Sequence, residues 1–113
     1  MKLGKKEITL KFTISACRKL EKYTNTSIFN MNEYFDEMSL DKITILLWIG
    51  YSYTNKDFTL DDAGELLDKL QAQGETLVDI LQWISDSFTR DINGLLGVKR
   101  EEASTEESAE SKN

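Results

Sequence analysis

The stretch SLDKITILLWIGYSY, residues 39–53, predicts the helix around which the rest of the chain packs. Apolar side chains cover nearly its whole circumference from Leu40 to Tyr53, and a helix without a polar face is normally the buried centre of a small domain. Ser39 is the expected N-cap. Gly50 costs up to about 1 kcal/mol relative to alanine inside a helix, so we expect another backbone to approach closely there.

Two amphipathic helices are expected on the C-terminal side of this segment. TLDDAGELLDKL, from Thr59, has Asp62 three residues after the cap, which is a capping-box pattern, and Gly74 is the expected stop. The last helix lies within GETLVDILQWISDSFTRDINGLLG, residues 74–97. Its apolar residues recur every three or four positions and therefore share one face; they are Leu77, Ile80, Leu81, Ile84, Phe88, Ile92 and Leu95.

The N-terminal side begins with an alternating segment. Ile8, Leu10 and Phe12 point one way, which predicts a half-buried strand near residues 6–12. Gly4-Lys5 is a turn that leaves only three residues for a partner strand. A hairpin this small is not stable alone, so it is expected to lie on the helices.

Two further helices are expected before the central one. The first covers residues 14–23 and is capped by Thr13. TNTS ends it. The second is shorter, covers residues 31–38 and takes Asn30 as its cap.

The predicted fold is therefore mainly α, with four to five short helices packed around the central apolar helix and a small N-terminal β-hairpin or strand. Residues 1–98 form this helical domain. KREEASTEESAESKN, residues 99–113, has five glutamates and no apolar residue larger than alanine. Such a segment cannot bury enough surface to offset its ordering entropy, so we expect a disordered acidic tail.

The charge balance argues against two classes of partner. The formal net charge is −6, which disfavours binding to nucleic-acid phosphates and to anionic membrane surfaces. The longest uncharged apolar run starts at Ile43 and is well short of the roughly 20 residues that span a bilayer. One cysteine and no cleavable leader indicate a cytoplasmic protein.

The residue types also argue against catalysis. The chain has no histidine and one cysteine, Cys17, which reads as a buried small hydrophobe. The acidic pair Asp61-Asp62 begins a helix and the pair Glu101-Glu102 lies in the tail, so both read as solvated charge. We therefore expect no enzyme activity, no metal and no cofactor.

Aromatic residues are the candidates for partner binding. Trp83 lies about 120° from the apolar stripe of the last helix. Either it packs under the hairpin or the short second helix, or it contacts a partner, since tryptophan is enriched at interface hot spots. Tyr51 and Tyr53 are further candidates, placed at the edge of the core with their hydroxyls in water. Trp48 is expected to belong to the core.

The order of these segments resembles a known family. EITLKFT, ISACRKLEKYTNTSIF, LLWIGYSY and FTLDDAGELLDKL, followed by a long final helix, resemble the tail assembly chaperones of long-tailed bacteriophages, especially those of Gram-positive hosts. The likeness covers residues 3–96 and rests on the L-W-x-G helix followed by F-T-L-D-D-A-G-E-L-L. The hairpin is shorter than in members with fuller N-terminal strands.

This resemblance implies a non-enzymatic role. Members of the family bind the tape-measure protein and keep it soluble in the host cytoplasm while tail-tube subunits polymerise around it, and they are absent from the finished virion. Many are made in two lengths by ribosomal frameshifting, and the longer form is thought to recruit the tail-tube protein. The ending SKN can be encoded by an adenine run on which ribosomes slip.

Two other classes remain open. A small helix-turn-helix regulator would use TLDDAGELLDKL as its recognition helix, although the acids of that segment outnumber its single lysine. A host-takeover adaptor that binds one folded partner is the other alternative, and self-association is also open. Gene order separates these classes, because a tail chaperone should be encoded between the tube gene and the tape-measure gene.

Overall fold

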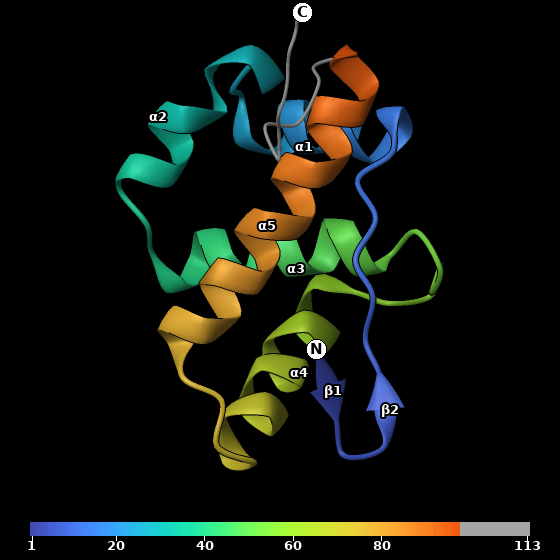
Figure 1. The fold of residues 1–113 in the computed structure, drawn as a ribbon, viewed down its shortest axis with the longest axis vertical. Helices are drawn as coiled ribbons and strands as arrows, with labels where there is room; N and C mark the ends of the chain where they lie inside the picture. Colours follow the sequence, from blue (N-terminus) through green and yellow to red (C-terminus); the bar gives the residue numbers. More distant parts are fainter. Residues whose placement is uncertain (98–113) are drawn as a thin grey trace, which may run out of the picture.

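The computed structural model describes residues 1–97 and has the predicted architecture, a mainly helical fold with a small N-terminal pair of strands (Figure 1). The predicted acidic tail, residues 99–113, lies outside the described residues. The elements in chain order are β1 (Lys2–Leu3), β2 (Lys6–Glu7), α1 (Ile14–Thr24), the 3₁₀ turn η1 (Ile28–Asn30), α2 (Met31–Asp36), α3 (Leu40–Tyr51), α4 (Leu60–Ala72) and α5 (Leu77–Leu96).

Helix α3 is the centre of the domain, as its sequence predicted. It contacts α1, α4 and α5, and α5 crosses in front of it in Figure 1. The Ser39 hydroxyl caps the helix by accepting a hydrogen bond from the Lys42 N–H at 3.2 Å. The helix ends at Tyr51, two residues before the predicted end. Its buried residues are Ile43, Ile45, Leu46, Leu47, Ile49, Gly50 and Tyr51.

The segment 8–12, which we call the N-terminal strap, is extended (Figure 1) but pairs with no strand in the part of the chain that the structure describes. Its alternation is as predicted, because Ile8, Leu10 and Phe12 are buried while the residues between them are exposed. Strand pairing stops at Glu7, however, so the predicted strand is shorter than expected. Ile8 still exchanges hydrogen bonds with Met1, but beyond it the strap runs over helices, and the N–H groups of Lys11 and Phe12 donate to Gly50 of α3 and Asp91 of α5.

The strap crosses α3 at Gly50. The Lys11 N–H donates to the Gly50 carbonyl oxygen at 3.0 Å. A Cβ at Gly50 would lie 2.8 Å from Cζ of Phe12 and 3.3 Å from Cβ of Leu10. The close approach predicted from the glycine is therefore confirmed, and the neighbour is the strap.

Replacing Gly50 with alanine is expected to lower the free energy of unfolding by about 1–2 kcal/mol. Overpacking a filled core costs about 1–3 kcal/mol, which exceeds the gain in helix propensity of up to about 1 kcal/mol. Gly64 is the matched control, since it is also helical but a Cβ there meets nothing within 4 Å. Urea denaturation of both variants should show Gly64→Ala as stabilising; stabilisation by Gly50→Ala as well would contradict the close crossing.

The hairpin is attached to the end of α4, in agreement with the expectation that it lies on the helices. The Gln73 side chain accepts a hydrogen bond from the Gly4 N–H at 2.9 Å and donates to the Lys2 carbonyl at 2.6 Å. Gly4 forms the turn with a φ of +61°, a conformation that glycine adopts without strain. One amide side chain thus supplies both partners for the exposed backbone of the turn and β1.

The predicted caps of α1 and α4 are confirmed. The Thr13 hydroxyl accepts from the Ala16 N–H at 3.1 Å. Thr59 and Asp62 exchange hydrogen bonds in both directions, so the capping box is complete despite the short aspartate side chain. Gly74 follows α4 with a φ of +110°, consistent with its role as a stop.

The second helix begins at Met31, as predicted, but the predictions of its capping side chain and of its end were wrong. Asn30 makes no side-chain cap; the Ser27 hydroxyl instead accepts from the Phe29 N–H and starts η1, which runs directly into α2. Helix α2 ends at Asp36 because the backbone leaves the helical region at Glu37, where φ is −124° and ψ is +85°. The Lys42 ammonium donates to the Glu37 carbonyl released there.

The buried face of α5 is rotated from the predicted stripe. Leu77 and Leu95, at its two ends, are exposed, whereas Ser87 and Asp91 are buried. The reason is the strap, which lies along the middle of α5 and covers the polar positions beside the apolar ones. The buried residues of the helix are Ile80, Ile84, Ser87, Phe88 and Asp91.

Candidate functional site

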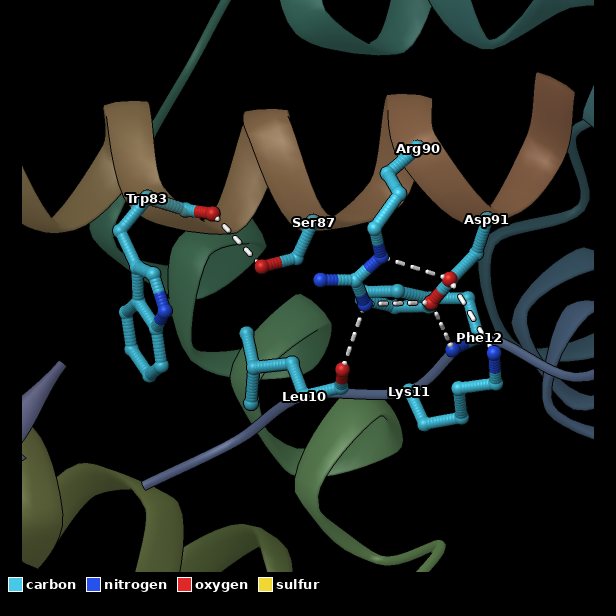
Figure 2. Close-up of polar contacts among 7 residues, drawn as sticks. All are labelled: Leu10, Lys11, Phe12, Trp83, Ser87, Arg90 and Asp91. Carbon is cyan, nitrogen blue, oxygen red and sulfur yellow. Dashed lines mark hydrogen bonds and ion pairs between the residues drawn. The ribbon is translucent and has the colours of Figure 1, made fainter. Parts of the chain in front are cut away.

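Trp83 lies partly buried where α5 faces the strap. Figure 2 shows its indole on the side of α5 that carries Ser87 and faces Leu10. The Ser87 hydroxyl, one turn later, donates to the Trp83 carbonyl at 2.9 Å. The indole borders a hollow of about 610 Å³. The hollow is lined by Met1, Glu7, Ile8, Thr9, Leu10, Asp79, Gln82, Trp83, Asp86, Ser87 and Arg90.

Trp83 combines features of the two alternatives that the sequence left open. Its inner part packs against the core, beside the N-terminal segment. The rest of the side chain borders a polar hollow open to solvent. Binding of a partner at Trp83 stays a prediction, and the next measurement separates that role from a purely structural one.

Replacing Trp83 with alanine is expected to lower the free energy of unfolding by about 2 kcal/mol. Truncating a fully buried tryptophan or phenylalanine to alanine costs about 3–5 kcal/mol. This indole is only partly buried, so the expected loss is smaller. Ile84→Ala is the control, because Ile84 is fully buried on the same helix. In thermal melts, the melting temperature of Trp83→Ala should be clearly higher than that of Ile84→Ala. Equal loss would assign Trp83 to the core.

The two predicted tyrosines are not brought together with Trp83. Tyr51 is only 7% exposed, and its ring meets that of Phe58 edge-on with ring centroids 4.8 Å apart. It therefore lies within the core rather than at its edge. A partner could reach little of it. Tyr53 is exposed and borders a separate hollow beside the start of α1. Their role in partner binding stays a prediction.

Trp48 lies at the boundary of the core. Its indole is partly buried, and Tyr23 of α1 contacts it edge-on with ring centroids 5.1 Å apart. The Lys19 ammonium lies 4.1 Å from the centre of the ring, which is a cation–π contact. Trp48 therefore supports the outer side of α1 as well as the core.

A buried carboxylate joins α5 to the strap (Figure 2). Asp91 accepts from the Phe12 N–H at 2.8 Å and from Arg90 at 2.9 and 3.0 Å, and Lys11 lies 3.4 Å away. Arg90 also donates to the Leu10 carbonyl at 2.9 Å. No local sequence pattern predicts this site, because Asp91 and Phe12 are 79 residues apart.

Electrostatics keep this carboxylate ionised. Burial alone would raise the pKa of Asp91, but the hydrogen bonds from Arg90 and Phe12, together with the charges of Arg90 and Lys11, lower the pKa below its ordinary value. All the partners are donors within the protein, and they consume the carboxylate's hydrogen-bonding capacity. The cluster therefore reads as a structural bridge rather than as a reactive group.

An apolar groove that the sequence analysis missed lies between α1, η1 and the end of α5. We call it the α1–α5 groove, and its volume is about 230 Å³. Ile14, Leu95 and Leu96 on its walls are exposed although they are large and apolar. The groove is lined by Ile14, Cys17, Arg18, Glu21, Ile28, Ile92, Leu95 and Leu96.

The sequence did contain a signal for this groove. Leu95 and Leu96 follow Phe88, the last buried apolar residue of α5, by about two turns, so the helix extends past the core. Assigning Leu95 to the buried stripe hid this overhang. Adjacent exposed apolar residues of this kind often mark an interaction site.

Cys17 is buried, as predicted, and lies at the inner wall of the groove. Burial raises the pKa of its thiol to about 11, with smaller contributions from the negative charges of Glu21 and Asp91. At neutral pH the residue is therefore an uncharged thiol, which extends the apolar lining.

Two absences concern the described part of the chain. Among residues 1–97, no three histidine, cysteine, aspartate or glutamate side chains gather in a way that could hold a metal ion. No helix in the same range is both long and apolar enough to cross a membrane.

Comparison with protein families, with curated proteins and with solved structures finds no match to this chain.

Proposed function

We propose that this chain is a tail assembly chaperone of a long-tailed bacteriophage. It binds an apolar helical segment of the tape-measure protein in the host cytoplasm, keeps that protein soluble during tail-tube assembly and is left out of the virion. A frameshifted longer form would recruit the tail-tube protein. The role requires no catalysis and no cofactor.

The observation that carries this proposal is the α1–α5 groove. A soluble coat for an apolar helix needs exposed apolar side chains held on rigid elements, and Ile14, Leu95 and Leu96 provide them on two packed helices. Recognition of an amphipathic helix in such a groove is a recurring mode of peptide binding. The family resemblance of residues 3–96 supplies the identity of the partner.

The outer face of α4 weighs against the regulator alternative. Asp61, Glu65 and Asp68 are exposed along this helix, which would have to serve as the recognition helix. Three carboxylates facing a DNA backbone would repel its phosphates. The same face is compatible with an adaptor or a chaperone, since neither needs to approach a polyanion.

Co-expression tests the proposal. The tape-measure protein encoded beside this chain is expected to accumulate in the soluble fraction only when the chain is present. The double variant Leu95→Glu/Leu96→Glu should abolish this effect, because it places two charges in the groove. Both side chains are exposed, so the variant should melt within a few degrees of the wild type.

Val78→Glu is the matched control. Val78 is 76% exposed and lies on the same helix, at the end away from the groove. It should leave tape-measure solubility unchanged. Equal loss in both variants would mean that surface apolarity in general, and not the groove, supports the chaperone activity. A tape-measure protein that is equally soluble without the chain would refute the proposed function.

A further inference from the structure

Charge is divided unequally along the described chain. Residues 1–24 contain seven basic and two acidic side chains, a net charge of +5, whereas residues 25–97 contain four basic and thirteen acidic ones, a net charge of −9. The basic side chains of residues 1–24 form two groups: one lies on the hairpin and the strap, and the other lies on α1. In Figure 1 the hairpin and α1 are at opposite ends of the long axis. The groove is therefore bordered by a basic helix in an acidic protein.

The bases of α1 form a ridge along one side of the groove. Arg18 lines both the groove and a neighbouring hollow on the outer face of α1, which Lys19 and Lys22 also line. Arg18 and Lys22 are one turn apart and both are exposed. Together with Lys19 they make this ridge the positive border of an apolar surface.

The protein does not neutralise the ridge within residues 1–97. No ion pair and no side-chain hydrogen bond in that range involves Arg18 or Lys22. Glu21 is the acid nearest in sequence, and its carboxylate accepts the Ile28 N–H at 2.8 Å, which commits it to the η1 turn. Within the described residues, these two cations therefore have no acidic partner and can meet a bound one.

We infer that the α1–α5 groove takes an amphipathic helix with an acidic flank. Its apolar stripe lies against Ile14, Leu95 and Leu96, and its aspartate or glutamate residues face Arg18 and Lys22. Ile14 and Glu21 are seven residues apart, about 10 Å along α1, so the contact spans about two turns of the bound helix. This inference deepens the proposed function and rests on it for the partner, since it states which segment of the tape-measure protein the groove selects.

Other occupants fit less well. Residues 98–113 carry five glutamates, but only one valine and two alanines as apolar side chains, so they have no stripe to fill the groove. A second copy would have to bring its exposed apolar residues to the groove. Outside the groove, the exposed large apolar residues of the described chain come from several different elements rather than from one helical stripe; they are Tyr23, Phe29, Leu40, Tyr53, Leu77 and Val78.

Two designed helical peptides of equal length test the inference. They share one leucine stripe and differ only in their flanks, glutamate in one and lysine in the other. Fluorescence anisotropy with the full-length chain should show that the glutamate peptide binds about tenfold more tightly, as two exposed ion pairs replaced by two repulsions would give. The result is discriminating because the net charge of −6 alone favours the lysine peptide.

Charge reversal on α1 is the second part of this peptide-binding experiment. Arg18→Glu/Lys22→Glu should invert the preference between the peptides. Lys5→Glu/Lys69→Glu makes the same change in net charge on the hairpin turn and α4, and should leave the preference in place. Equal or tighter binding of the lysine peptide by the unmodified chain overturns the inference, and so does failure of both peptides to bind.

Further outcomes identify the other occupants. Self-association that is detected by light scattering and lost in Leu95→Glu/Leu96→Glu would assign the groove to a second copy and overturn the inference. Binding of the glutamate peptide only after removal of residues 98–113 would assign it to the chain's own end. If Arg18→Glu/Lys22→Glu still solubilises the tape-measure protein fully while the leucine variant does not, the proposed function stands and the acidic partner is excluded.

Discussion

Asp91→Ala is expected to lower the free energy of unfolding by about 3 kcal/mol or more, because removing one partner of a buried, hydrogen-bonded ion pair typically costs about 3–5 kcal/mol. The change leaves the Phe12 N–H without an acceptor inside the core and deprives Arg90 and Lys11 of their counter-charge. Urea denaturation followed by circular dichroism measures the loss.

Asp86→Ala is the control for this variant. Asp86 lies on the same helix, is exposed, and within residues 1–97 accepts a side-chain hydrogen bond from Gln82 alone. Its replacement should change stability by no more than about 0.5 kcal/mol. If Asp91→Ala unfolds at the same urea concentration as Asp86→Ala, the bridge between α5 and the strap contributes nothing.

The pH dependence of Asp91→Asn gives an independent check. The pKa of Asp91 is lower in the folded protein than its ordinary value of 3.8, so the unfolded chain takes up the proton first as the pH falls. The stabilisation is therefore complete above about pH 5 and decreases as the pH falls through the folded pKa. The difference in stability between wild type and Asp91→Asn should shrink between about pH 5 and pH 2. A difference that is constant over this range would show that the charge is not involved.

Phe12→Ala is expected to cost about 3–5 kcal/mol, the usual loss when a buried phenylalanine is truncated. Phe12 is 1% exposed, its ring meets Phe88 edge-on with centroids 5.2 Å apart, and it covers Gly50. The loss would show that a segment outside the helices closes the core. Phe29→Ala is the matched control, because Phe29 is 75% exposed and should tolerate the change within about 0.5 kcal/mol.

If Phe12→Ala does not fold, a milder variant can be measured in its place. Phe12→Leu keeps most of the apolar volume and should cost about 1–2 kcal/mol. It should also reduce the stability loss caused by Gly50→Ala, because the Phe12 ring atoms that a Cβ at position 50 would meet are gone. Additive losses in the double variant would contradict a direct contact between the two positions.

The features that sequence predicts well here are local. The caps at Thr13, Ser39 and Thr59 depend on residues three positions apart, and each forms as expected. The apolar circumference of α3 and the alternation of the strap likewise report burial directly. Gly50 is the informative exception, because its helix-weakening cost indicated a long-range contact.

The features that sequence missed depend on residues far apart in the chain. Asp91 reads as a surface carboxylate until the strap, about 80 residues earlier, is placed against it. Leu95 reads as part of the buried stripe because periodicity cannot show where the core ends. The α1–α5 groove combines both difficulties, since Ile14 and Leu95 meet only after α1 and α5 have packed.

The strap also sets the order in which this protein can be completed during synthesis. Phe12 leaves the ribosome 79 residues before Asp91, the residue that accepts its N–H. At about 5–20 residues per second, this interval lasts several seconds. Until α5 emerges, the apolar side chains of the strap have α3 as a partner but nothing to cover them from the other side. The nascent chain therefore passes through a stage in which this apolar surface is uncovered, and such a surface is the kind that folding chaperones bind.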